Sequence, residues 1–215
     1  KKNKIFLLDC GCNYGFYSFY TASLSSQNFV VAIEASLTTV EDFKKNLNLN
    51  KFNNIILQNF AISDIDNTTI TFNESQNDWE SSLTHSEFDE KKITKIKTQK
   101  IDTIIKNQKI NDYSLLIKLD IEGNELQAIE GAKNTIKKYK PIIIIELSSY
   151  IFNNKNQAFN YLKSFLSEFN YSIYSTKMKL ITIEDVTLLI NNLDTKHKTI
   201  GNYYLINNKN IHKFK

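Results

Sequence analysis

The feature that most constrains this chain is an apolar run that ends in an acid and leads into a glycine loop. Residues 7–15 read Leu-Leu-Asp-Cys-Gly-Cys-Asn-Tyr-Gly, and a second apolar run over residues 29–33 ends in Glu34. In α/β proteins such glycines let the backbone approach a ligand closely, and an acid about 20 residues further on binds ribose hydroxyls. Glu34 follows Gly15 by 19 residues, so the spacing predicts a nucleoside-binding site.

The loop has the pattern D-x-G-x-x-x-G rather than the G-x-G-x-x-G of dinucleotide sites. It carries Asn13 where a dinucleotide site would approach a pyrophosphate. This favours a cofactor without phosphates, and S-adenosylmethionine is the evident candidate. An NAD-linked oxidoreductase fits the Glu34 offset but would need a third close glycine. We expect Asp9 to orient the loop by accepting backbone N–H bonds, and Glu34 to bind both ribose hydroxyls.

The adenine is expected beyond the third apolar run, where Phe60 either stacks on the base or belongs to the core. The expected cofactor-binding residues come from the glycine loop and from the ends of the strands: Asp9, Gly11, Asn13, Tyr14, Gly15, Glu34, Ala35, Asn59, Phe60, Ala61 and Asp120.

Strand and helix patterns alternate along the chain, which predicts a doubly wound, mostly parallel sheet with helices on both faces. We expect one domain over residues 1–215. Because the first residue is Lys1 rather than Met, we also expect a trimmed product or one domain of a longer chain. The expected helices are 16–24, 39–47, 101–105, 125–138 and 158–169. The expected strands are 5–9, 29–34, 54–59, 95–101, 115–120, 141–147, 171–175, 179–183 and 202–206, with an edge hairpin at 68–73 and no comparable helix among the last segments.

Composition excludes several classes of function. All 27 basic residues are lysines, they are scattered, and the net charge is only +4, so we expect a solvated surface rather than a nucleic-acid interface. Two cysteines are too few for a zinc site and do not call for an oxidising compartment. No run is long enough for a membrane span and no secretory signal is visible, so the sequence predicts a cytoplasmic protein.

Acids end four of the apolar runs, namely Asp9, Glu34, Asp120 and Glu146. The carboxyl ends of parallel strands are where doubly wound sheets bind ligands. Lys118 lies two residues before Asp120 and shares its face of the strand, and a lysine inside an apolar strand needs an acidic partner.

The group around Lys118 has a structural and a functional interpretation. Lys118, Asp120 and Glu122 form either a structural ion pair at a strand end, or a general base beside the methyl donor or a hook for a substrate hydroxyl. Asp120 and Glu122 have the oxygen donors that magnesium accepts, but we expect no metal to be required.

Taken together, these segments resemble the FkbM family of S-adenosylmethionine-dependent methyltransferases. The matching segments run in family order over about residues 5–147, and the most specific is Lys118-Leu119-Asp120-Ile121-Glu122-Gly123-Asn124-Glu125. The others are Leu8-Asp9-Cys10-Gly11-Cys12-Asn13-Tyr14-Gly15, Ala32-Ile33-Glu34-Ala35, Asn46-Leu47-Asn48-Leu49-Asn50, Ala61-Ile62-Ser63-Asp64, Ser81-Ser82-Leu83, Ile129-Glu130-Gly131-Ala132 and Lys140-Pro141-Ile142 to Glu146.

The resemblance implies a class I methyltransferase fold, Rossmann-like, with seven strands of which the last is antiparallel. It also implies O-methylation of a hydroxyl on a sugar, polyketide or similar small metabolite or glycan. Two departures from the family pattern are Cys12 in place of the usual alanine and Ala35-Ser36 in place of a proline-containing turn. The expected catalytic residues are Asp120, Lys118, Glu122 and Glu146.

Two alternatives differ in class from this interpretation. A domain of the same fold that has lost catalysis would bind a nucleoside and act as an interaction module, but it would not need the cluster at residues 118–125. A nucleic-acid amino-methyltransferase would carry an Asn/Asp-Pro-Pro-aromatic motif where this chain has Asp120-Ile121-Glu122-Gly123. A homodimer or a partner domain is compatible with the sequence.

Overall fold

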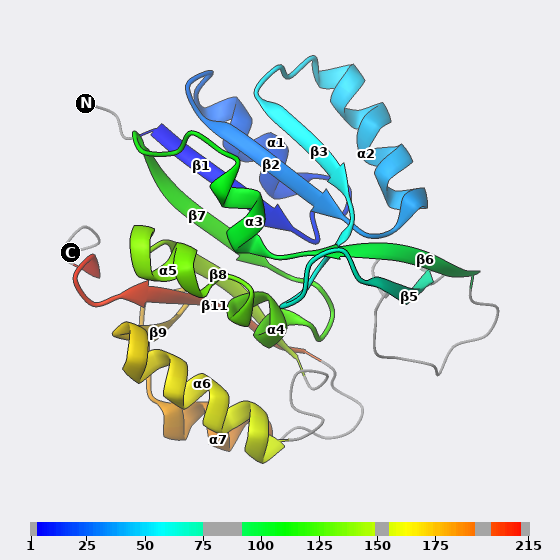
Figure 1. Ribbon diagram of the computed structural model, residues 1–215. Helices are drawn as coiled ribbons and strands as arrows, with labels where there is room; N and C mark the ends of the chain where they lie inside the picture. The colour runs from blue at the N-terminus through cyan, green and yellow to red at the C-terminus, as the bar shows by residue number, and fades with distance from the viewer. Residues whose placement is uncertain (1–3, 75–91, 149–154, 192–198, 212–215) are drawn as a thin grey trace.

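An eight-stranded sheet forms the centre of the protein in the computed structural model, which describes residues 4–74, 92–148, 155–191 and 199–211 (Figure 1). The strand order is β10-β9-β11-β8-β7-β1-β2-β3. The strands are β1 (Lys4–Cys10), β2 (Phe29–Glu34), β3 (Ile55–Asn59), β7 (Tyr113–Leu119), β8 (Ile142–Ser148), β9 (Tyr171–Ser175), β10 (Leu180–Ile181) and β11 (Thr199–Asn207).

Strand direction follows the prediction of a mostly parallel sheet with an antiparallel last strand. Neighbouring strands pair in parallel from β8 through β7, β1 and β2 to β3. The last strand, β11, lies between β8 and β9 and is antiparallel to both. The short β10 adds an eighth strand to the seven that were expected.

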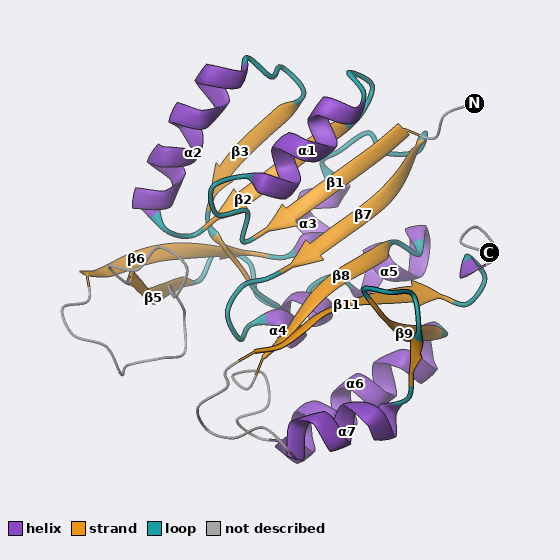
Figure 2. Ribbon diagram, turned by 180° about the vertical axis from the view of Figure 1, so that it is seen from behind, coloured by secondary structure: helices purple, strands orange, loops and turns teal. Residues whose placement is uncertain are grey.

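Helices cover both faces of the sheet because the strands alternate between two apolar cores. Leu7, Val30 and Ala32 pack with α1 (Phe16–Leu24) and α2 (Leu37–Asn50). Phe6, Leu8, Val31 and Ile33 belong to the larger core on the other face. Figure 2 shows the opposite side of the molecule from Figure 1, with α1 in front of the sheet. The helices of the larger core are α3 (Ile101–Lys106), α4 (Glu125–Glu130), α5 (Lys133–Tyr139), α6 (Lys155–Phe169) and α7 (Ile183–Asn191).

A second, three-stranded sheet stands beside the main one, in the order β4-β6-β5 (Figure 1). It contains the expected hairpin, because β5 (Thr69–Glu74) pairs antiparallel with β6 (Lys92–Gln99). The two-residue β4 (Ala61–Ile62) pairs in parallel with the end of β6. The sequence between these hairpin strands, with the family segment at residues 81–83, lies outside the described residues.

The single helix expected over residues 125–138 is wrong, because the chain forms α4 and α5 instead. Two backbone N–H groups at the start of α5, those of Asn134 and Thr135, donate to the Asp102 carboxylate at 3.1 and 2.7 Å. Gly131 separates the helices, and its carbonyl accepts from the Asp102 N–H at 2.9 Å. A distant carboxylate therefore starts a new helix inside a continuous apolar pattern, and local periodicity does not contain that information.

The last third of the chain also differs from the prediction. The strand expected over residues 179–183 is reduced to β10, and α7 follows it where no helix was expected. Thr182 and Asp185 form a reciprocal cap, in which Thr182 N–H donates to the Asp185 carboxylate at 2.9 Å and Asp185 N–H donates to Thr182 Oγ1 at 3.1 Å. Val186 of this helix is fully buried in the larger core. Among the described helices, none is long and apolar enough to cross a membrane.

We predict that Gly131→Ala destabilises the protein by about 1–3 kcal/mol. A Cβ at this position would lie 2.3 Å from the carbonyl oxygen of Ser63, which is backbone and cannot rotate away. Urea denaturation measures the free energy of unfolding, and Lys137→Ala on the exposed side of α5 is the control, expected to change it by less than about 0.5 kcal/mol. Equal stability of the two variants would contradict the prediction.

Candidate functional site

Four acidic side chains lie at the carboxyl edge of four neighbouring strands, as the sequence predicted. The order β8-β7-β1-β2 places Glu146, Asp120, Asp9 and Glu34 side by side along this edge. Asp9 and Glu34 lie within their strands, Asp120 directly follows β7, and Glu146 lies two residues before the end of β8. Ligands of doubly wound sheets bind at this edge.

Lys118 joins three parts of the edge. It lies directly opposite Asp9 in the pairing of β7 with β1, and only 5% of its side chain is exposed. Its Nζ lies 3.0 Å from Asp120 Oδ2 and 3.7 Å from Asp9 Oδ1, and it donates to the Gly11 carbonyl at 2.9 Å. Of the two acidic partners that the sequence offers Lys118, Asp120 and Glu122, the structure pairs it with Asp120.

The electrostatics keep Lys118 positively charged. Burial by itself would lower the pKa of Lys118, but the carboxylates of Asp9 and Asp120 outweigh it and hold that pKa above its usual value. The ring centroid of Tyr17 lies 5.4 Å from Nζ, a further favourable contact for the cation. With so little of its side chain exposed, Lys118 links β1, the glycine loop and Asp120; its catalytic role stays a prediction.

The role expected for Asp9 is wrong in its detail. Asp9 is fully buried; its Oδ2 accepts from the Ser18 hydroxyl of α1 at 2.6 Å, and its Oδ1 faces Lys118. The loop N–H groups that were expected to bind it donate elsewhere, since those of Gly11 and Cys12 both bond to the Ile33 carbonyl at 3.0 Å. Asp9 therefore anchors α1 and Lys118 beneath the loop.

Gly11 and Gly15 are needed for packing within the protein. Gly11 has φ +71°, and a Cβ there would lie 1.8 Å from the Asp120 carbonyl oxygen. Gly15 precedes α1 with φ +93°, and its missing Cβ makes room for the rings of Phe19 and Phe43. The loop can thus lie against the end of β7, which brings the edges of β1 and β7 together.

Glu34 connects the glycine loop to α2. Its Oε2 accepts from the Asn13 N–H and its Oε1 from the Ser36 N–H, both at 3.0 Å. Burial raises the pKa of Glu34, and these backbone donors partly oppose that rise. A carboxylate has about four acceptor positions, so Glu34 keeps the capacity to accept ribose hydroxyls. This residue and the loop fit a nucleoside without a phosphate partner.

The other residues that the sequence predicts to bind the cofactor differ in their burial and contacts. Asn59 Nδ2 donates to the carbonyls of Glu34 and Ala35 at 2.8 and 3.0 Å, so it fixes the ends of β2 and β3. Phe60 is 8% exposed and belongs to the larger core, which is the second of its two expected interpretations. Ala61 is buried in β4, whereas Tyr14 in the glycine loop is 41% exposed.

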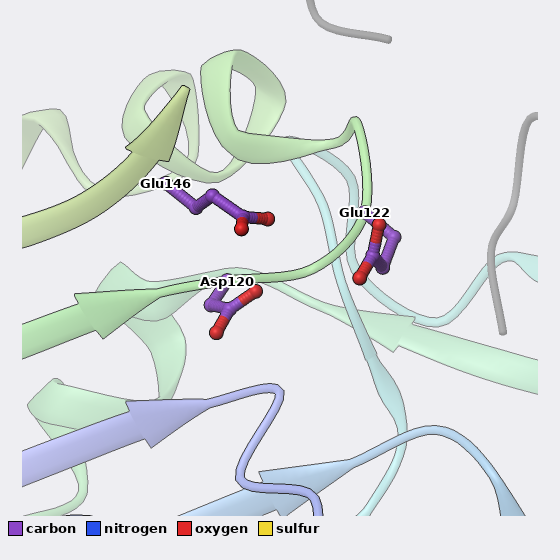
Figure 3. Close-up of side chains that lie close together, drawn as sticks. All are labelled: Asp120, Glu122 and Glu146. Atoms are coloured by element: carbon purple, nitrogen blue, oxygen red, sulfur yellow. The ribbon is translucent and has the colours of Figure 1, made fainter. Parts of the chain in front are cut away.

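A group of carboxylates lies next to this loop, on the β8 side. One carboxylate oxygen each from Asp120, Glu122 and Glu146 lies within 4.8 Å of the others. Figure 3 shows these carboxylates converging from the end of β7, from the loop that follows it and from β8. We call this group the carboxylate cluster. Among the described residues it is the one group near enough to share a metal ion, and the absence of a metal requirement stays a prediction.

The carboxylate cluster retains a proton near neutral pH. Burial raises the pKa of Glu146 to about 8, and the nearby charges of Asp120 and Glu122 and a side-chain hydrogen bond with Asp120 act in the same direction. Carboxylates this close avoid ionising together. The cluster can therefore accept or hold a proton at the pH at which enzymes commonly work.

Three residues near this edge were not singled out from the sequence. The sequence pattern predicts only a helix for Tyr17 and Ser18, and the structure shows Ser18 in contact with Asp9 and Tyr17 in contact with Lys118. Glu125 closes the sequence segment at residues 118–125; it is fully buried and accepts from the N–H groups of Ile121 and Gly123. A serine within an aromatic helix and an acid at the start of a helix are weak signals by themselves.

Comparison with known proteins gives one family. The sequence profile of the Methyltransferase FkbM domain matches residues 9–173. The crystal structure of methyltransferase FkbM from Methylobacillus flagellatus KT superposes with a TM-score of 0.51 and 18% identity, covering 94% of this chain and 43% of that one. This chain thus spans less than half the length of that protein. No curated protein sequence matches significantly.

A second solved structure has a similar fold. A putative rRNA-methylase from Clostridium thermocellum gives a TM-score of 0.50 and 12% identity, covering 94% of this chain and 86% of that one. At such low identities the two structural likenesses support the fold and no more than the fold.

We predict that the free energy of unfolding falls as the pH rises from about 5 to 8. Burial raises the pKa of Glu125 to about 7 and that of Glu146 to about 8, from ordinary values near 4.5. Over this interval the folded protein keeps protons that the unfolded chain has released, so each increase in pH favours unfolding.

Urea denaturation at several pH values measures the slope. Glu146→Gln should make the decline shallower because glutamine does not titrate, whereas Glu41→Gln on the exposed face of α2 should leave it unchanged. A stability that rises over this interval, or a slope that is identical in Glu146→Gln, would contradict the pKa assignment.

Proposed function

The chain belongs to the FkbM methyltransferase family, and we propose that it transfers a methyl group from S-adenosylmethionine to a hydroxyl of a small molecule or glycan. The observation that carries the proposal is the carboxylate cluster beside the glycine loop. A protein that only bound a nucleoside would need the loop and Glu34, but not three converging carboxylates on the neighbouring strands.

S-adenosylmethionine is the methyl donor of this family, and when bound it supplies a methyl group that is already activated by the sulfonium. Glu34 is the residue that would hold its ribose, because its carboxylate lies at the loop with acceptor capacity left. Asn13 and Tyr14 would line the same side. The protein is then left with aligning the acceptor and removing one proton.

Asp120 is the residue best placed to take the acceptor's proton. About a third of its side chain is exposed, Lys118 holds one of its oxygens at 3.0 Å, and Glu146 hydrogen-bonds to it. Glu122 lies on the same side of Asp120, within the carboxylate cluster.

The charge of the cluster also limits the acceptor. Asp120, Glu122 and Glu146 face one space, while the neighbouring cation Lys118 is buried behind Asp120. An acceptor that carries a phosphate or carboxylate next to its hydroxyl would be repelled there. We therefore propose an acceptor that is neutral or positively charged around the reacting hydroxyl, such as a sugar ring, and not a nucleic acid.

The direct test is methyl transfer from labelled S-adenosylmethionine to a panel of neutral, cationic and anionic hydroxyl compounds, with and without a chelator. The proposal expects a methyl ether on a neutral or cationic member, at a rate that the chelator does not change. Binding of S-adenosylmethionine without transfer to any member would favour the inactive binding domain instead.

For Asp120→Asn we predict a fall in kcat of about 100-fold or more, because general-base catalysis contributes rate factors of this order. Affinity for S-adenosylmethionine, measured by calorimetry, should change little. Asp112→Asn, in the exposed loop before β7, is the matched control and should keep the full rate. An Asp120→Asn protein with unchanged turnover would refute the role of Asp120.

For Glu34→Ala we predict an affinity for S-adenosylmethionine that is weaker by at least about tenfold, or about 1.4 kcal/mol. The change removes the expected ribose acceptor and releases the Asn13 N–H from its partner. Calorimetry on Glu34→Ala and on the exposed control Glu41→Ala separates this loss from a general effect of removing an acid. Equal affinities in the two variants would argue against a ribose site at Glu34.

A further inference from the structure

The loop between β7 and α4 contains two consecutive residues in the left-handed backbone region. It covers residues 120–124, and two consecutive members, Glu122 and Gly123, have positive φ values of +55° and +109°. The left-handed region is unfavourable for a residue that carries a Cβ. Glu122 adopts it nevertheless, and this conformation brings its carboxylate into the cluster with Asp120 and Glu146.

Glu125 supplies contacts that hold this turn. Its Oε1 accepts from the Ile121 N–H at 2.9 Å, and its Oε2 accepts from the Gly123 N–H at 3.0 Å. These N–H groups flank Glu122 on both sides, so one carboxylate spans the strained residue. Glu125 is fully buried, so water does not compete for these hydrogen bonds.

The cofactor side of the edge is held by other contacts. The glycine loop is fixed by the Ile33 carbonyl, by Lys118 and by Glu34. The hydrogen bonds of Glu125 are made to residues that follow Asp120 in the chain, next to the carboxylate cluster where the proposed acceptor would bind. A change at Glu125 should therefore disturb the carboxylate cluster and leave the nucleoside side in place.

We propose that Glu125 is a positioning residue, which holds Glu122 in its left-handed conformation and so sets the geometry of the carboxylate cluster. The inference rests on the proposed methyl transfer for its effect on rate, but its structural part stands by itself. Glu125 does not touch the acceptor; it acts through Ile121, Glu122 and Gly123.

Glu125→Gln is the informative variant, because it keeps the size of the side chain while an amide NH₂ replaces one of the two accepting oxygens. Glu125→Asp keeps the charge but is one carbon shorter, and it serves if the glutamine variant fails to fold. The control is Glu130→Gln, the same substitution on the same helix, where Glu130 contacts Lys133 and Tyr161 away from the cluster.

Hydrogen exchange tests the structural part without any acceptor. In Glu125→Gln the amides of Ile121 and Gly123 should exchange at least about tenfold faster than in the wild type, with the glycine-loop amides of Gly11 and Cys12 unchanged. Glu130→Gln should match the wild type at all four amides. Unchanged exchange at Ile121 and Gly123 in a folded variant would overturn the proposal.

Kinetics test the functional part with the acceptor found for the wild-type protein. Glu125→Gln should lose at least about tenfold in kcat, with calorimetric affinity for S-adenosylmethionine within about twofold of wild type. Wild-type kcat, or an equal loss of cofactor affinity, would overturn the role on the acceptor side. If the wild-type protein methylates no hydroxyl, the proposed function fails, and the exchange data still decide whether Glu125 holds the turn.

Discussion

The buried charge of Lys118 is the interaction on which the rest of this edge depends. Removing a charge from water costs several kcal/mol, and removing one partner of a buried pair typically costs about 3–5 kcal/mol. The ion pairs with Asp9 and Asp120 and the hydrogen bond to the Gly11 carbonyl offset the desolvation of Lys118. Because those three groups come from β1, from the end of β7 and from the glycine loop, one ammonium group fixes how they lie relative to one another. The buried ammonium group of Lys118 thereby orients the Asp120 carboxylate.

Lys118 lies between two groups of residues at the carboxyl edge of the sheet, one next to β2 and one next to β8. On the side of β2, Glu34 links the glycine loop to α2 through two backbone N–H groups. On the side of β8, Asp120, Glu122 and Glu146 converge, and Glu125 holds the turn between them. The first side offers oxygen acceptors for the proposed ribose, and the second offers carboxylates for the proposed hydroxyl acceptor. A methyl transferase needs both sides at a fixed separation, and the rigid strands β7 and β1 provide it.

Sequence patterns predicted what depends on neighbours along the chain. The alternation of strand and helix patterns predicted α1, β2 and β9 with the bounds that the structure has, and the apolar runs predicted the acids at the strand ends. What they missed depends on partners far away in the chain. Asp102 starts α5 from about thirty residues away, and Gly11 is a glycine because of the Asp120 carbonyl. Asp9 was assigned to the loop N–H groups because nothing local shows that Ser18 and Lys118 face it.

The central claim is that the methyl donor binds at this edge, with its ribose at Glu34 and its sulfur facing the carboxylate cluster. A crystal structure of the complex with S-adenosylhomocysteine tests it most directly. We expect ribose hydroxyls within hydrogen-bond distance of the Glu34 carboxylate and the sulfur on the same side of the sheet edge as Asp120. A nucleoside bound away from Glu34, or a sulfur turned away from Asp120, would refute this binding mode.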